Sequence, residues 1–176
     1  LGRRPVRDLP RPEHVMQLCH PDLSNDFPPL RTAKPARAHN LPAQLTSFIG
    51  RRAQLAQLHE SLADHRLVTL TGAGGAGKTR MAVEVSSQLI AEFPDGVWYV
   101  DLAPITDPAM VAVTVAHTLG LPDQPGRSLV EIVVRFVADR DVLLLLDNCE
   151  HLLDSCGDLV MTLLAGCPQL TILATS

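Results

Sequence analysis

The chain has 176 residues, of which 46% are hydrophobic and only 3% aromatic, and its formal net charge is -4. This length suffices for one domain with its own core and an appendage, and the core must be built from Leu, Val, Ile and Ala. Residues 41–176 are acidic, with eight Lys/Arg against fifteen Asp/Glu. An acidic surface argues against direct nucleic-acid contact by this segment.

The lack of a targeting signal and the use of cysteine both predict a cytoplasmic location. The sequence has no signal-peptide pattern and no apolar run of about 18 residues, so we expect no contact with a membrane. Its four cysteines lack C-x-x-C pairing, which favours buried thiols in a reducing compartment. A metal site at Cys149-Glu-His151 would need about four ligands, and the sequence offers no closed set. Because the first residue is Leu, we expect a segment of a longer protein.

The first 44 residues predict no core of their own. In residues 1–20 we expect one short strand, over residues 14–19. The pattern Asp8-Leu9, Pro12-Glu13, Val15 and Gln17-Leu18 resembles the end of a class III nucleotide cyclase domain. The resemblance implies a remnant without cyclase activity, and a disordered basic leader is the alternative. Residues 21–44 contain five prolines and no hydrophobic period, so we interpret them as a linker before a domain that begins at residue 45.

The phosphate-binding motif lies at the centre of that domain. A β-branched apolar run, residues 67–71, stops at a glycine-rich loop that matches G-x-x-x-x-G-K-[ST]. Glycines let the loop turn its N–H groups toward phosphate oxygens at the start of a helix. Lys78 would face the β- and γ-phosphates, and the Thr79 hydroxyl would bind Mg²⁺. The nucleotide-binding residues predicted from the loop are Gly72, Ala73, Gly74, Gly75, Ala76, Gly77, Lys78, Thr79 and Arg80.

A second motif predicts the metal end of the same site. Five apolar residues, 142–146, predict a strand buried on both faces of a parallel sheet, and Asp147 would emerge at its carboxyl end, where ligands bind. We expect Asp147 and Thr79 to hold Mg²⁺, although Asp147 could instead cap a helix. Glu150 could activate the attacking water or be a first-turn residue favoured by the helix dipole. The predicted catalytic set is Lys78, Asp147 and Glu150.

The remaining apolar patterns predict alternating helices and strands. Helical spacing occurs around residues 55–62, 78–91, 107–119, 128–137 and 152–164, and strand patterns occur at 97–102 and 170–176. Ser128 and Glu131 form a possible capping box at the start of one helix. With connections long enough for crossovers, we predict an α/β fold of the P-loop NTPase type, an open parallel sheet with helices on both faces.

Three segments together resemble one family. Phe48-Ile49-Gly50-Arg51, the glycine-rich loop and Asp147-Asn-Cys-Glu-His151 are similar to the STAND ATPases, the signalling branch that includes NB-ARC proteins and bacterial LuxR-type regulators. The resemblance implies contacts from Phe48, Ile49, Gly50 and Arg51 to adenine or ribose. It also implies a sheet in which strand 67–71 lies at the edge, followed by strands 170–176, 142–147 and 97–102. Thr175 and Ser176 would lie near the γ-phosphate.

The resemblance also implies an activity. It predicts that ATP or ADP binds with Mg²⁺ and is slowly hydrolysed, with nucleotide state coupled to homo-oligomerisation and transcription in a longer protein. The alternative is a scaffold that holds ADP without hydrolysing it. This chain has Arg52 where the family usually has Glu. The family's sensor arginine, fifth strand, helical lid and winged helix would lie outside this sequence.

Overall fold

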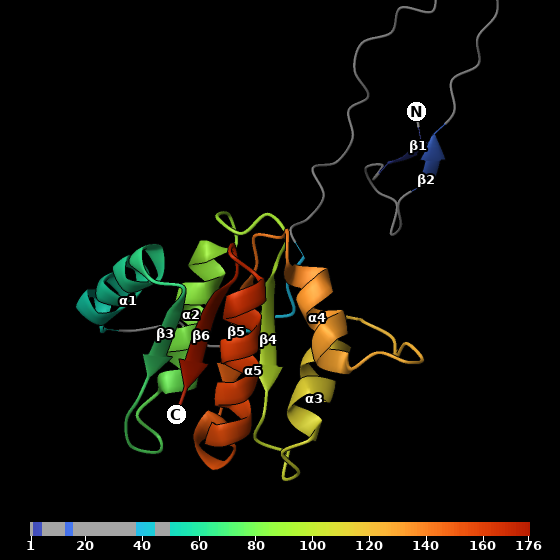
Figure 1. Cartoon of the computed structure of the whole chain (residues 1–176). Coiled ribbons are helices and arrows are strands. Elements are labelled where there is room, and N and C mark those ends of the chain that lie inside the picture. The colour runs from blue at the N-terminus through green and yellow to red at the C-terminus, as the bar shows by residue number, and fades with distance from the viewer. Residues whose placement is uncertain (1, 5–12, 16–37, 45–49) are drawn as a thin grey trace, which may run out of the picture. The chain divides into compact units, whose positions relative to one another are not determined.

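The computed structural model describes residues 2–4, 13–15, 38–44 and 50–176, which belong to two compact units, 1–36 and 37–176 (Figure 1). In the first unit, β1 (Gly2–Arg4) pairs with β2 (Glu13–Val15) in antiparallel fashion. Only the start of the strand predicted over residues 14–19 is visible in β2. The rest of that prediction lies outside the described residues.

The second unit is an α/β domain. Its elements in chain order are α1 (Arg52–Asp64), β3 (Leu67–Leu70), α2 (Lys78–Leu89), β4 (Val97–Asp101), α3 (Met110–Thr118), α4 (Leu129–Val137), β5 (Leu143–Asp147), the 3₁₀ helix η1 (Cys149–His151), α5 (Leu153–Gly166) and β6 (Thr171–Thr175). The four strands are all parallel and lie in the order β3-β6-β5-β4. This confirms the predicted fold class and strand order.

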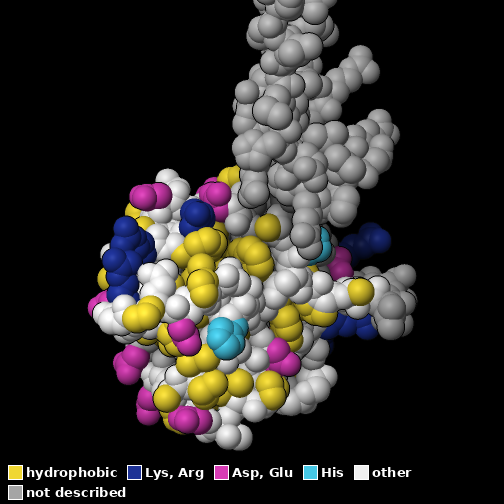
Figure 2. Space-filling model, turned by 90° about the vertical axis from the view of Figure 1, so that its right-hand side faces the viewer, with side chains coloured by type: hydrophobic (Ala, Val, Ile, Leu, Met, Phe, Trp, Pro, Cys, Tyr) yellow, Lys and Arg dark blue, Asp and Glu magenta, His cyan; other side chains and the backbone are white. Residues whose placement is uncertain are grey.

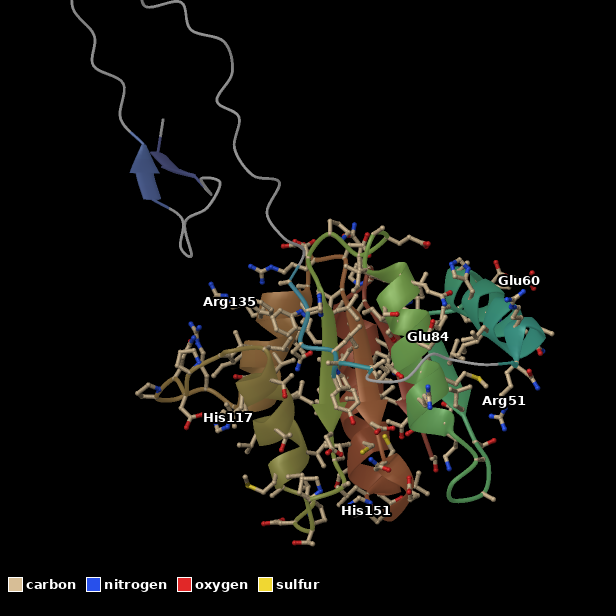
Figure 3. The ribbon with its side chains drawn as sticks, turned by 180° about the vertical axis from the view of Figure 1, so that it is seen from behind. Arg51, Glu60, Glu84, His117, Arg135 and His151 are labelled. Atoms are coloured by element: carbon tan, nitrogen blue, oxygen red, sulfur yellow. The ribbon has the colours of Figure 1, made fainter. Side chains whose placement is uncertain are left out.

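Helices cover both faces of the sheet because its central strands are apolar on both sides. All five residues of β5 and of β6 are buried. Leu143 and Leu145 pack with α1 and α2, whereas Leu144 and Leu146 pack with α3, α4 and α5. The two views agree, since α5 lies in front of the sheet in Figure 1 and α2 lies in front of it in Figure 3. The core is therefore two apolar layers separated by the sheet.

Two helix starts show how local hydrogen bonds set the boundaries. At α4 the predicted capping box is present, because Glu131 N donates to Ser128 Oγ at 3.2 Å while Ser128 N donates to Glu131 Oε2 at 3.4 Å. The preceding helix begins at Met110 instead of residue 107. There the Asp107 carboxylate accepts a hydrogen bond from Ala109 N at 2.9 Å, which closes a turn before the helix begins.

A short segment ahead of the domain lies along the free side of β4. We call residues 38–44 the N-terminal strap. His39 forms a parallel bridge with Val97, and Val97 N donates to Ala38 O at 3.0 Å. The sequence pattern places these residues in the linker, whereas in the structure they belong to the second unit. These contacts use backbone groups of β4, so no hydrophobic pattern in the strap could predict them.

The strap follows β4 closely because one residue there is glycine. Gly96 has φ +121°, a region that L side chains rarely adopt, and a Cβ at this position would lie 2.7 Å from Trp98 Nε1 and 2.8 Å from Ala38 O. The absence of a side chain thus permits the close approach of strap, indole and strand.

The surface formed by α3 and α4 is mixed in character. On this side, which faces the viewer in Figure 2, hydrophobic side chains gather in the middle, with acidic, basic and histidine side chains around and among them. Among the residues that the structure describes, no helix combines the length and the apolar character needed to cross a membrane.

Candidate nucleotide site

The glycine-rich loop has the predicted strand-loop-helix context. It follows β3, and α2 begins at Lys78 directly after it. Gly75 and Gly77 have φ values of +76° and +80°, which only glycine adopts without strain. These conformations turn the chain into the first turn of α2, so the N-terminal end of the helix, with its backbone N–H groups, adjoins the loop. This arrangement suits an anionic ligand.

Lys78 closes the loop on itself. Its Nζ donates to Gly72 O at 2.7 Å and to Ala73 O at 3.2 Å. A phosphate oxygen would be a stronger partner than either carbonyl, because it carries a negative charge that attracts the Lys78 ammonium group as well as accepting its hydrogen bond. The loop therefore holds a cation ready to move onto an entering phosphate.

Asp147 stands behind the loop at the carboxyl end of β5. Asp147 is buried, with 1% of its surface exposed. Oδ1 accepts hydrogen bonds from Thr79 Oγ1 at 2.8 Å and Thr175 Oγ1 at 2.5 Å, and Oδ2 accepts from Tyr99 OH at 2.9 Å and Asn148 Nδ2 at 3.1 Å. The alternative that Asp147 caps a helix is wrong, since the N-cap residues of η1 and α5 are Asn148 and Leu152.

The groups around Asp147 form one network. Thr175 Oγ1 also accepts a hydrogen bond from Asn148 N at 3.0 Å, and Asn148 Nδ2 reaches Asp101 Oδ1 at 3.3 Å. Burial, followed by the hydrogen bond to Asp147, raises the pKa of Tyr99 well above its usual value. Since the charged form of the phenol is disfavoured, Tyr99 remains a hydrogen-bond donor.

A pocket of about 560 Å³ opens in front of this network, within the usual size range of ligand sites. It is lined by Pro42, Ala43, Gln44, Gly74, Gly75, Gly77, Lys78, Thr79, Arg80, Val83, Asn148 and Glu150. Three separate segments thus form its walls: the strap, the loop with the start of α2, and the turn after β5. Asp147 does not line the pocket, but two residues that do, Thr79 and Asn148, donate hydrogen bonds to it.

The oxygen groups at this position fit a magnesium ion that arrives with phosphate. Mg²⁺ prefers oxygen ligands and is usually held by one or two protein groups together with phosphate oxygens and water. Thr79 lines the pocket, and its hydroxyl group donates to the Asp147 carboxylate behind it. Within the described ranges, no group of three or more His, Cys, Asp and Glu side chains could hold a metal by itself. The site therefore suits a metal-phosphate complex better than a free ion.

The turn after β5 directs Glu150 and His151 to different surroundings. Glu150 is exposed and lines the pocket. His151 is turned toward another segment, because its Nε2 lies 2.7 Å from Ile105 O (Figure 3). Cys149 Sγ lies 3.6 Å from Leu146 O. The Cys149 thiol and the His151 ring therefore contact different segments of the chain.

The segment predicted to contact adenine or ribose is described only in part. Phe48 and Ile49 lie outside the described residues. Gly50 and Arg51 have φ values of +83° and +54° and lead into α1. Arg51 Nη1 donates to Ala76 O of the glycine-rich loop at 2.7 Å (Figure 3). Arg51 is therefore bound to the loop itself.

Sequence reasoning missed the groups that support Asp147 and the wall formed by the strap. The sequence pattern predicts Tyr99 only as one residue of an aromatic strand. Its contact with Asp147 depends on the pairing of β4 with β5. The available signal was its place two residues before the carboxyl end of β4, the same edge at which Asp147 ends β5. The strap gives no such signal, because it ends the proline-containing segment 21–44, whose composition suggests a linker.

Comparison with known sequences relates the domain to a family. Residues 61–172 match the sequence model of the AAA domain. An uncharacterized protein of Mycobacterium tuberculosis is 45% identical over 159 residues, which are 90% of this chain and 39% of that protein. A Mycobacterium bovis protein, provisionally named an HTH-type transcriptional regulator, is 57% identical over 115 residues, which are 65% of this chain and 13% of that protein.

Solved structures show the same fold at low sequence identity. The ORC2 protein of Aeropyrum pernix, solved as ADPNP-ADP complexes, has a TM-score of 0.54 at 19% identity, over 72% of this chain and 41% of that one. Cdc6p from Pyrobaculum aerophilum has a TM-score of 0.53 at 20% identity, over 77% and 40%. The chain thus spans well under half the length of the relatives it matches. Because the match to the family extends over more than half of this chain and includes the phosphate-binding loop, the chain belongs to the AAA domain family of P-loop proteins.

Proposed function

We propose that residues 37–176 form a nucleotide-binding switch module that takes ATP or ADP with Mg²⁺ within a larger signalling or transcriptional regulator. The observation that carries this proposal is the hydrogen bond from Thr79 to Asp147 at the back of the pocket lined by the glycine-rich loop. It joins the two motifs that a metal-bound nucleotide requires, and Lys78 lies on the same loop to meet the phosphates.

The finer family assignment also belongs to this proposal. We infer a STAND-type module of the NB-ARC kind, as found in LuxR-type regulators. The contact of Arg51 with the glycine-rich loop supports this inference, because it brings Gly50 and Arg51 beside the site. The similarity to an HTH-type regulator supports the transcriptional setting. Because this chain covers only 13% of that regulator, we infer that the module is one part of a longer protein. Homo-oligomerisation and a cytoplasmic location stay predictions.

The segments ahead of the domain are assigned on the sequence pattern. We propose that residues 1–20 are the remnant of a cyclase-like domain and that residues 21–36 connect it to the nucleotide module. The strap, which follows this connection, contributes Pro42, Ala43 and Gln44 to the pocket. The nucleotide module therefore begins near residue 37 in our proposal, ahead of the boundary at residue 45 that the sequence pattern predicts.

Slow hydrolysis is favoured over a scaffold that only holds ADP. Glu150 is exposed and lines the same pocket as the glycine-rich loop. A carboxylate in this position could orient a water molecule toward the terminal phosphate. A residue that served only the helix dipole would have no need to line the pocket.

The test of nucleotide binding is the Lys78→Ala variant, studied by calorimetry with ATP and Mg²⁺. Hydrogen bonds to charged groups are worth about 1.5 to 3 kcal/mol each, so the affinity should fall by about ten-fold or more. Arg135→Ala is the matched control, because it also removes one positive charge, from an exposed position on α4 that does not line the pocket. Equal affinity for Lys78→Ala and the unmodified chain would refute the phosphate site.

A further inference from the structure

Tyr99 reaches the metal end of the site from a neighbouring strand. It lies on β4, paired with Leu145 of β5, and Asp147 follows Leu145 by two residues. Residues two apart on a strand share a face of the sheet, so Tyr99 and Asp147 both project toward the face covered by α2. Tyr99 packs with the apolar residues on that face and extends its OH to 2.9 Å from Asp147 Oδ2.

The carboxylate of Asp147 has no spare position. A carboxylate offers about four lone-pair sites. Here all are used, two by threonine hydroxyls on Oδ1 and two by Tyr99 and Asn148 on Oδ2. A buried carboxylate with every site occupied cannot rotate without breaking a hydrogen bond, which is costly away from water. Its orientation is thus fixed from both oxygens.

The fixed carboxylate determines how Thr79 faces the pocket. Because the hydroxyl proton of Thr79 is donated to Asp147, the oxygen lone pairs of Thr79 remain available toward the pocket. We propose that Tyr99 is a positioning residue of the nucleotide site: its phenol holds Asp147 in the orientation that keeps the Thr79 oxygen directed at a phosphate-bound Mg²⁺. This inference rests on the proposed function and adds a residue that neither motif contains.

The backbone of Tyr99 is fixed as well. Asn40 of the strap donates from Nδ2 to Tyr99 O at 2.8 Å and accepts from Tyr99 N at Oδ1, at 2.6 Å. The amide side chain thus occupies the place of a further strand along the edge of β4. Pairing at both the N–H and the C=O holds the strand beneath the phenol. The strap that supplies Asn40 continues into the pocket wall. Asn40 therefore connects this wall, through Tyr99, to the carboxylate of Asp147.

Tyr99→Phe tests the proposal because it removes one oxygen and keeps the ring. ATP affinity is measured by calorimetry with Mg²⁺ and again in excess EDTA. A hydrogen bond to a buried carboxylate should be worth about a three- to ten-fold change, so we expect affinity to fall by that factor with Mg²⁺ and to stay within about two-fold in EDTA. A role in packing alone would lower both affinities equally or neither, and either result would overturn the proposal.

Two further variants make the outcome unambiguous. Trp98→Phe alters the adjacent side chain of β4, which packs with the apolar cluster of α3, α4 and α5. It should lower the melting temperature while leaving the difference between Mg²⁺ and EDTA unchanged. Lys78→Ala separates the two levels of inference. If Lys78→Ala weakens binding but Tyr99→Phe does not, only the role of Tyr99 is wrong, whereas no effect of Lys78→Ala would refute the site itself.

Discussion

The Thr79 hydroxyl donates a hydrogen bond to Asp147 Oδ1 at 2.8 Å, although the two residues are 68 positions apart in the sequence. Thr79 belongs to the first turn of α2 and Asp147 ends β5. The glycine-rich loop and α2 follow β3, which β6 separates from β5, so this contact requires the sheet to be assembled first. The metal end of the site is therefore a property of the fold and not of either motif alone.

Asp147→Asn should weaken binding chiefly when metal is present. The substitution keeps the size of the side chain but removes the negative charge behind Thr79 and places an NH₂ group among four donors. We expect ATP affinity with Mg²⁺ to fall by about ten-fold or more, with little change in excess EDTA. Calorimetry under both conditions measures the difference.

The variant also needs a control for folding, because Asp147 is buried. Thermal melting should be recorded for Asp147→Asn beside Asp158→Asn, which changes an exposed aspartate of α5 that does not line the pocket. If Asp147→Asn lowered affinity equally with metal and with EDTA, Asp147 would be a structural residue of the network, and the metal role would fail.

Gly96→Ala should destabilise the domain at the strap. A methyl group would lie 2.7 Å from Trp98 Nε1 and 2.8 Å from Ala38 O, on a backbone with φ +121°. Strain and overpacking together predict a loss of roughly 2 to 5 kcal/mol in the free energy of unfolding. Chemical denaturation measures this loss.

Gly120→Ala provides the matched comparison. Gly120 also has a positive φ, +70°, but a Cβ there would meet nothing within 4 Å. Its loss should be about 1 kcal/mol, from backbone strain alone. Equal losses for the two variants would mean that the strap does not press against β4 in solution.

The local motifs carried most of what the sequence could predict. The glycine-rich loop, the buried run that ends at Asp147 and the capping box of Ser128 and Glu131 are each defined by residues close together in the chain. Their outcome depends on short-range spacing, so a single sequence suffices. The sheet order was also predicted, but from the family resemblance and not from periodicity.

Contacts between distant segments could not be predicted in this way. Tyr99 touches Asp147 only because β4 and β5 pair with Asp101 opposite Asp147. Asn40 bonds to the backbone of Tyr99, 59 residues away, and backbone groups leave no trace in a sequence pattern. Arg51 donates to Ala76 O of the loop, 25 residues away, and its predicted contact with a base or ribose stays a prediction. Each of these contacts depends on strand register or chain direction, which composition does not encode.

Glu150→Gln distinguishes a hydrolysing switch from a scaffold that only holds nucleotide. The carboxylate lines the pocket, and a general base typically contributes about 10²- to 10⁴-fold to the rate. We therefore expect phosphate release in a single-turnover assay to slow by about 10²-fold or more, while ATP affinity stays within about two-fold, because Gln keeps the size and polarity of the side chain.

Asp154→Asn is the control, since Asp154 is an exposed acid in the first turn of α5 that does not line the pocket. If both variants release phosphate as fast as the unmodified chain, Glu150 serves only the start of the helix and the ADP-holding scaffold becomes the better description. A slow rate confined to Glu150→Gln would instead identify Glu150 as the residue that activates water.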